Sequence, residues 1–267
     1  MSAPPSFDAP WTLNGKTAIV TGDSRGIGQA ISVHLARKGL TRLAITYASN
    51  IEAAEETLKR CQELGLEQAI AIKADALDPQ FGPKTIAEVV KRLGTPIIDI
   101  LVNNAILSDP AKALPIKDTT LDVFLEIMQA NFYAPVSLTT ALLPHLPDYG
   151  GRVINISSIL AYQANSDPTV AYGASKTALQ SYTRAFAKNF SNLKKATFNS
   201  FLDGQIRDTT AGERIGVPKD IAYVVSFLVS EEGRWVNGAA PEDILGFSVL
   251  EIDLIVQVEH SAGVARD

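Results

Sequence analysis

A short apolar run, a glycine-rich turn and a helical pattern follow one another in TAIVTGDSRGIGQAISVHLAR, which spans Thr17 to Arg37. Thr17–Thr21 has the composition of a buried strand, and roughly Ile27–Arg37 has the spacing of a helix. Glycines in such a turn let the backbone approach a phosphate, and the unpaired N–H groups at the start of a helix attract its negative charge. Because the turn lies directly between a strand and a helix, it predicts the pyrophosphate site of a dinucleotide. The residues expected there are Gly22, Ser24, Arg25, Gly26, Ile27 and Gly28.

Beyond Arg37 the chain alternates β-prone runs with longer helical patterns. We expect strands over Leu43–Tyr47, Gln68–Lys73, Ile97–Val102, Arg152–Ile156 and Thr197–Leu202. We expect helices over about Ile51–Leu64, Lys84–Leu93, Leu121–Leu143, Val170–Phe190 and Lys219–Leu228. Strand–helix alternation of this kind is typical of a parallel sheet with helices on both faces. The predicted fold class is therefore α/β, a Rossmann-like doubly wound parallel sheet in a single domain.

This domain is expected to cover residues 13–238. Residues 1–12, with three prolines among the first ten residues and no apolar run, are expected to form a flexible N-terminal arm. Residues 239–267 form a divergent C-terminal segment that contains the β-prone stretch Val249–Val258. We expect this segment to supply either a last strand or a substitute lid over the substrate.

The bulk composition excludes several classes of function. Hydrophobic residues make up 46% of the 267 residues and charged ones 20%, which is ordinary for a globular chain. The net charge of −5 provides no basic field, so nucleic acid is not expected as a partner. Cys61 is the only cysteine, and the three histidines lack the spacing of metal ligands, so neither a disulfide nor a metal is expected. With no apolar stretch long enough to cross a bilayer, a cytoplasmic location is expected, away from membranes.

The end of the second expected strand bears on the choice of cofactor. An acidic residue there would hold the adenosine ribose hydroxyls of NAD. The chain instead reads Tyr47-Ala48-Ser49-Asn50, with no carboxylate before Glu52. Arg25 could bind a 2′-phosphate, with Ser49 and Asn50 donating hydrogen bonds. The sequence therefore favours NADP(H), and the alternative is a solvated Arg25 beside a ribose site that accepts either cofactor.

Four further patterns follow the glycine motif in a fixed order. They are Asn103-Asn104-Ala105 after an apolar strand, Asn131 within a helix, Ser158 after a strand, and the Tyr-x-x-x-Lys pair Tyr172 and Lys176. Together with the glycine motif, their order and spacing resemble the short-chain dehydrogenase/reductase family over about residues 15–238. The resemblance implies the Rossmann-like fold, a nicotinamide cofactor and hydride transfer to or from a small-molecule carbonyl or alcohol substrate.

The chemistry of these residue types agrees with that reaction. Tyr172 and Lys176 lie four residues apart on an expected helix, so their side chains share a face. An ammonium group beside a phenol favours the phenolate and lowers the phenol pKa, so Tyr172 can act as general acid and base. Ser158 would donate a hydrogen bond to the same substrate oxygen and stabilise its developing charge. Because the two serines are adjacent, Ser157 is the alternative.

Other roles come from the resemblance alone. It implies that Asn131 anchors a water molecule in a proton relay and that Lys176 also holds the nicotinamide ribose. Asp75 would contact the adenine. The remaining cofactor contacts implied are Asn103, Ala105, Tyr172 and Ile206. Asn103 and Asn104 also have a purely structural interpretation, in which they satisfy backbone groups between strands.

The segment after the sixth strand departs from the family pattern. Asp203 stands where the family usually has proline, Asp208 stands in the usual threonine position, and the loop that ends before Arg214 is too short for the usual lid. The leading hypothesis is an NADPH-dependent carbonyl reductase or alcohol dehydrogenase that forms homodimers or homotetramers through its two long helices. The altered loop Asp203–Glu213 keeps two alternatives open. One is a non-redox cyclisation, dehydration or isomerisation, and the other is a non-catalytic binding protein.

Overall fold

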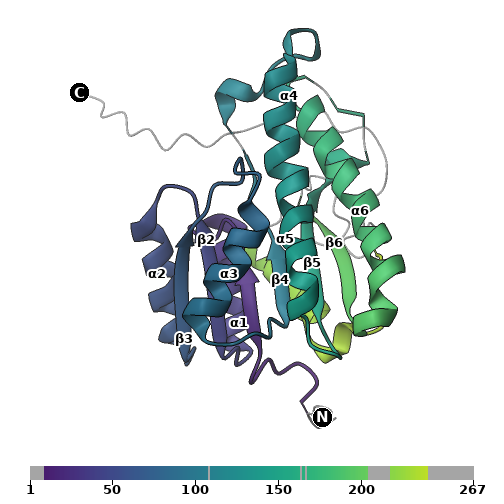
Figure 1. Ribbon diagram of the computed structural model, residues 1–267. Coiled ribbons are helices and arrows are strands. Elements are labelled where there is room, and N and C mark those ends of the chain that lie inside the picture. Colours follow the sequence, from purple (N-terminus) through teal and green to yellow (C-terminus); the bar gives the residue numbers. More distant parts are fainter. Residues whose placement is uncertain (1–8, 108, 163, 166, 204–216, 240–267) are drawn as a thin grey trace, which may run out of the picture.

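Six parallel strands form one sheet in the computed structural model, which describes residues 9–107, 109–162, 164–165, 167–203 and 217–239 (Figure 1). The strands are β1 (Thr17–Val20), β2 (Arg42–Tyr47), β3 (Gln68–Lys73), β4 (Ile100–Asn103), β5 (Arg152–Ser158) and β6 (Thr197–Asp203). Their spatial order is β3-β2-β1-β4-β5-β6, and every neighbouring pair is parallel. The direction of strand addition reverses between β1 and β4, the place at which such sheets bind ligands. The fold prediction is confirmed.

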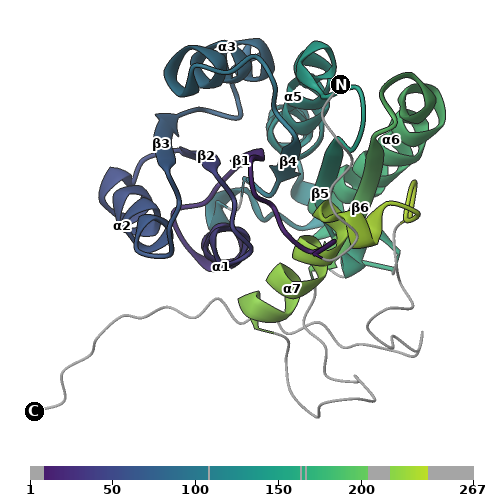
Figure 2. The ribbon, with the colours of Figure 1, turned by 90° about the horizontal axis from the view of Figure 1, so that it is seen from below.

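Helices cover both faces of this sheet (Figure 2). Helices α1 (Gly26–Arg37), α2 (Ile51–Gln62) and α7 (Pro218–Val229) lie on one face. Helices α3 (Phe81–Leu93), α5 (Ala134–Leu142) and α6 (Val170–Lys194) lie on the other, and α4 (Leu121–Met128) precedes α5. The sheet is therefore the middle layer of three, and all four residues of β1 are buried.

The core consists of two apolar clusters, one on each face of the sheet. Val20 and Ile45 belong to the cluster under α1, whereas their neighbours Ile19 and Ala44 belong to the cluster on the opposite face. This division follows from the strand geometry, since successive side chains point to opposite faces. A strand that is buried on both faces has an unbroken apolar sequence, and for this reason β1 and β4 could be predicted from their apolar runs.

The prediction of one continuous helix over Leu121–Leu143 is wrong. The segment is divided into α4, a π-helical turn over Gln129–Tyr133, and α5. Pro135 lies at the start of α5 and has no N–H to donate to the carbonyl of Asn131, four residues earlier. The helix therefore widens by one residue at this point, and such π-turns are frequent at functional sites.

Smaller boundary differences have local causes. The strand expected to begin at Ile97 begins at Ile100, because the Ile98 N–H donates to the His145 carbonyl rather than to a neighbouring strand. The helix expected to end at Phe190 continues to Lys194, where Lys195 ends it in the left-handed conformation.

The two ends of the domain are only partly described. Of the expected arm, residues 9–12 are described, and the Pro10 carbonyl accepts a hydrogen bond of 3.0 Å from the Glu231 N–H, so this part of the arm is attached to the domain. At the other end, Gly238 N–H donates to the Phe198 carbonyl, and the Ala239 carbonyl accepts from Ser200 N–H. These bonds place residues 238–239 along β6, and the rest of 239–267 lies outside the described residues. Within the described part of the chain, no helix has the length and apolar character needed to span a membrane.

Candidate active site

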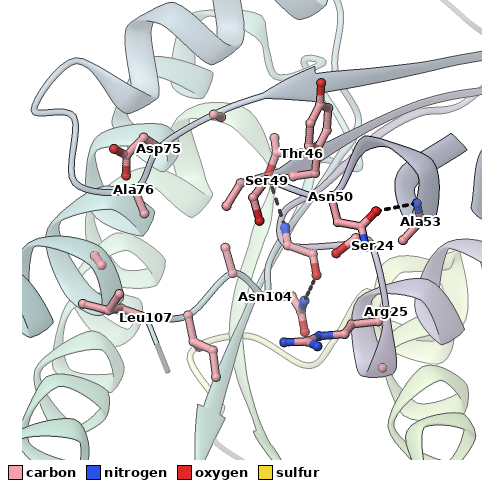
Figure 3. Close-up of a pocket in the computed structure, with 18 of the residues that line it drawn as sticks. Ser24, Arg25, Thr46, Ser49, Asn50, Ala53, Asp75, Ala76, Asn104 and Leu107 are labelled. Atoms are coloured by element: carbon pink, nitrogen blue, oxygen red, sulfur yellow. Dashed lines mark hydrogen bonds between the residues drawn. The ribbon is translucent and has the colours of Figure 1, made fainter. Parts of the chain in front are cut away.

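A pocket of about 650 Å³ opens at the carboxyl ends of the strands, next to the switch between β1 and β4 (Figure 3). Its walls come from the glycine loop, the ends of β2 and β3, and the segment after β4. The described residues that line it include Gly22, Ser24, Arg25, Gly26, Ile27, Thr46, Ser49, Asn50, Asp75, Asn104, Ala105, Leu107 and Ala130. Most of the predicted cofactor residues therefore lie together.

The glycine loop has the geometry of a phosphate cradle. Gly22 has a φ of +67°, and a Cβ placed there would lie 2.7 Å from the Ala105 Cα. A Cβ on Gly28 would lie 2.8 Å from the Gly22 carbonyl oxygen. Neither position can take a side chain without a backbone shift, which explains both glycines. The first turn of α1 has no side-chain cap and no acidic residue, so its N–H groups fit an anionic pyrophosphate.

The asparagine pair after β4 separates into two roles. The Asn104 side chain donates to the Thr21 and Gly22 carbonyls at 2.9 and 3.1 Å and thereby holds the glycine loop. The Asn103 side chain turns into the core, where it donates to Asn155 Oδ1 at 2.7 Å. Of the two, Asn104 lines the pocket, whereas Asn103 was the predicted cofactor contact. Strand alternation sends successive side chains to opposite faces, and sequence alone did not show which of the two faces the cofactor.

The adenosine end of the pocket contains the residues that were predicted to select NADP(H). Ser49 and Asn50 are exposed at the start of α2, where Asn50 Oδ1 accepts from Ala53 N–H at 2.9 Å. Arg25 is exposed and makes no ion pair with any other described residue. In Figure 3 its side chain extends below Asn104, on the other side of the glycine loop from Ser49. A shared 2′-phosphate contact therefore requires the flexible Arg25 side chain to rotate. Asp75 accepts from Leu77 N–H at 2.9 Å and also lines the pocket.

Tyr172 and Lys176 lie on the same face of α6, as their spacing predicted. Lys176 Nζ is 5.6 Å from the centroid of the Tyr172 ring. The lysine is only 2% exposed, and its Nζ donates to the Ile156 carbonyl at 2.8 Å. The pairing of β5 with β4 ends at Asn155, so Ile156 lies beyond the end of the neighbouring strand and its carbonyl receives the ammonium group instead. A cation is thereby held beside the half-buried phenol.

The two adjacent serines have different surroundings. Ser157 is fully buried, and its hydroxyl accepts a hydrogen bond of 2.9 Å from Gln180 Nε2 on α6. Ser158 is the last residue of β5, and its hydroxyl accepts a longer bond of 3.3 Å from Leu160 N–H. This arrangement favours Ser158 over Ser157 as the residue that meets a substrate.

Asn131 lies in the π-helical turn and is completely buried. Its Oδ1 accepts from Leu107 N–H at 2.7 Å, which ties the turn to the segment that lines the pocket. Its Nδ2 is buried and has no hydrogen-bond partner among the described residues. A free donor at this position fits the proposed anchoring of a water molecule.

Cys61 is packed in the core under α1 and α2. It is fully buried, and this burial is the main cause that raises the pKa of its thiol to about 12. A thiol that stays protonated is a poor nucleophile. The described residues also contain no cluster of three potential metal ligands.

Some predicted features lie outside the described residues. They are Ile206, Asp208 and the rest of the loop from residue 204 to 216. Asp203 is the last residue of β6, where its backbone pairs with Ser158.

Comparisons with known proteins agree with this geometry. The model of the family described as short chain dehydrogenase matches residues 16–215. Short chain dehydrogenase asqE of Emericella nidulans is 50% identical over 260 residues, which cover 90% of this chain and 96% of the relative. Hydroxynaphthalene reductase arp2 of Aspergillus fumigatus is 34% identical over 255 residues, which cover 85% and 90%. The crystal structure of the angucycline C-6 ketoreductase LanV with bound NADP has a TM-score of 0.77 at 34% identity and covers 86% of this chain and 94% of its own.

The fold and the pocket thus define a dinucleotide-binding α/β protein. The chain belongs to the short-chain dehydrogenase/reductase family. It is accordingly an oxidoreductase of carbonyl or alcohol groups that uses a nicotinamide cofactor.

Proposed function

We propose that this protein is an NADPH-dependent carbonyl reductase that reduces a ketone of a cyclic, polyketide-like compound. The observation that carries the proposal is the buried Lys176, held by Ile156 beside the Tyr172 ring at 5.6 Å. A protein that no longer catalyses a reaction has no need of a buried lysine in this position, because burying a charge is costly. The similarity to a hydroxynaphthalene reductase and to an angucycline ketoreductase supports the substrate class.

The glycine loop and the adenosine end of the pocket would hold NADPH, which would supply the hydride that the substrate carbonyl carbon receives. Tyr172 gives its hydroxyl proton to the carbonyl oxygen, and the Lys176 ammonium stabilises the phenolate that this leaves. Ser158 donates a hydrogen bond to the same oxygen as negative charge develops on it. In the oxidation of an alcohol, the same residues act in reverse, with Tyr172 as the base. The Nδ2 of Asn131, which has no hydrogen-bond partner in the described part of the chain, would hold the water that returns the proton.

The function is tested by incubating the protein with NADPH and a panel of cyclic ketones while product mass is measured. A ketone reductase yields a product heavier by two hydrogens and consumes one NADPH for each product molecule. A product of unchanged mass would instead favour the non-redox alternative. NADPH binding without any product from the panel would favour the binding-protein alternative.

We expect Arg25→Ala to weaken NADPH binding by roughly 10- to 100-fold while NADH binding changes little, since a charged hydrogen bond contributes about 1.5–3 kcal/mol. The preference for NADP(H) rests on the exposed Arg25, Ser49 and Asn50, which line the same pocket, and a relative that carries bound NADP supports it. Calorimetric titration with each cofactor measures the two affinities. Arg37→Ala, an exposed arginine at the other end of α1, is the matched control. Equal losses for both cofactors would rule out a 2′-phosphate contact.

We also propose a homodimer or homotetramer in the cytoplasm. Helices α4 and α6 carry exposed apolar side chains, among them Leu121, Leu125 and Tyr182, which are 70%, 52% and 46% exposed. Exposed apolar side chains on two helices that contact each other are typical of an interface. The single, buried cysteine Cys61 is compatible with a reducing compartment.

We expect light scattering to give a mass two or four times the chain mass of 28.6 kDa. Leu125→Glu should shift the protein toward the monomer, because it places a charge on the proposed interface. Leu64→Glu, an exposed leucine after α2, should leave the mass unchanged. A monomer for the unaltered protein at micromolar concentration would contradict the assembly.

A further inference from the structure

Asp23 occupies an unusual place in the glycine loop. Its neighbours Gly22 and Ser24 both line the pocket, whereas Asp23 is 0% exposed and turns away from it into the core. The carboxyl group therefore lies directly beneath the predicted pyrophosphate site without touching it. The mechanism above gives this buried acid no role.

Three elements of the fold meet at this residue. The Ser32 hydroxyl of α1 donates a short hydrogen bond to Asp23 Oδ2. The Asp23 N–H donates to the Thr46 carbonyl of β2 at 3.1 Å, and the Asp23 carbonyl accepts from the Thr57 hydroxyl of α2 at 3.3 Å. Asp23 is thus the point at which the glycine loop is fastened to β2, α1 and α2.

The surroundings of the carboxyl group disfavour a negative charge. Its Oδ1 is buried and has no hydrogen-bond partner among the described residues. Its Oδ2 meets the uncharged hydroxyl of Ser32 on α1. The titratable group facing it from α2 is Cys61, whose thiol stays protonated, and Arg60 lies one residue before that thiol. Burial raises the pKa of the Asp23 carboxyl well above its usual range, and the weaker effect of the Ser32 hydrogen bond lowers it.

We propose that Asp23 is a positioning residue that holds the cofactor loop as a neutral carboxylic acid, and that loss of its proton weakens the binding of the nucleotide. The inference rests on the proposed binding of NADPH at this loop. An ionised Asp23 would leave an unpaired charge in the core, and the loop could relieve it only by moving toward water. The same charge would repel the pyrophosphate through the loop.

The test compares the unaltered protein with Asp23→Asn, which keeps the shape and the hydrogen-bonding capacity of the neutral acid but cannot ionise. NADPH dissociation constants are measured from about pH 6 to about pH 9. Changes in the charge of NADPH itself affect both proteins equally and cancel in their ratio. We expect similar affinities at the acidic end, and then a loss in the unaltered protein of up to about tenfold per pH unit above the pH at which Asp23 ionises.

Thermal or denaturant unfolding provides a second readout that does not require the cofactor. The unfolded chain releases the Asp23 proton at lower pH than the folded chain, so the folded state holds more protons between the two pKa values. The stability of the unaltered protein should therefore fall relative to Asp23→Asn as pH rises above about 4. Asp78→Asn is the control, because the Lys84 ammonium lowers the pKa of the Asp78 carboxyl. The stability of the unaltered protein relative to Asp78→Asn should therefore change in the opposite direction and rise with pH.

Ser32→Ala keeps the proposal testable if the asparagine variant does not fold. Without the hydroxyl, which favours the ionised form, the loss of NADPH affinity should begin at higher pH than in the unaltered protein. A constant ratio of NADPH affinities between the unaltered protein and Asp23→Asn, together with parallel stability curves, would overturn the role of Asp23. Failure of both proteins to bind NADPH at every pH would instead refute the proposed function.

Discussion

Replacement of Tyr172 by phenylalanine should lower ketone reduction on the order of 10²- to 10⁴-fold, the usual contribution of a positioned general acid. The change removes one hydroxyl and keeps the ring, so the packing of α6 against η5 (Ile159–Ala161) should survive. NADPH affinity should change little, because the glycine loop and the adenosine end are untouched. Steady-state turnover and calorimetric titration on the same preparation separate the two effects.

Tyr182→Phe is the matched control for this experiment. It removes the same atom from an exposed tyrosine of the same helix. Turnover in this control should stay close to that of the unaltered protein. If Tyr172→Phe retained full activity, the proton in the reaction would have to come from another group, and the acid role of Tyr172 would be lost.

Lys176→Met should have an effect of similar size on turnover but a different pH profile. Methionine fills much of the same space, yet it removes the ammonium group that stabilises the phenolate and donates to Ile156. Without the cation, the phenolate is less stable, so the remaining alcohol oxidation should climb toward high pH. The measurement is the rate of NADP⁺-dependent oxidation between about pH 7 and about pH 10.

Lys188→Met makes the same substitution at an exposed position three turns further along α6 and should leave both rate and pH profile unchanged. Circular dichroism on both variants verifies that the helix is intact. Loss of rate in Lys176→Met without any change in its pH profile would mean that the lysine acts by packing or by ribose binding alone.

The two halves of the site differ in how directly the sequence revealed them. The phosphate cradle and the Tyr172–Lys176 pair are local patterns, because each depends on residues within one turn or one strand–turn–helix unit. Helical periodicity places Tyr172 and Lys176 on one face wherever α6 packs. The glycines mark the loop because only they tolerate its backbone and the approach of Ala105. For the same reason, strand–helix alternation was enough to predict the parallel sheet.

Other features depend on partners that are remote in sequence, and only the folded chain reveals them. Asn104, rather than Asn103, lines the pocket, where its side chain donates to the carbonyl of Thr21, 83 residues earlier. The hydroxyl of Ser157 accepts a hydrogen bond from Gln180, 23 residues later, whereas Ser158 lies at the end of β5.

The sequence by itself therefore determined the α/β fold, the glycine loop and the shared helix face of Tyr172 and Lys176, since short-range sterics and periodicity fix these features. The tertiary structure alone decided which of Asn103 and Asn104 lines the pocket. It also placed Asn131 in a π-turn and buried Asp23 beneath the cradle. Burial and hydrogen-bond partners are set by how distant segments pack, and no local pattern of residues carries that information.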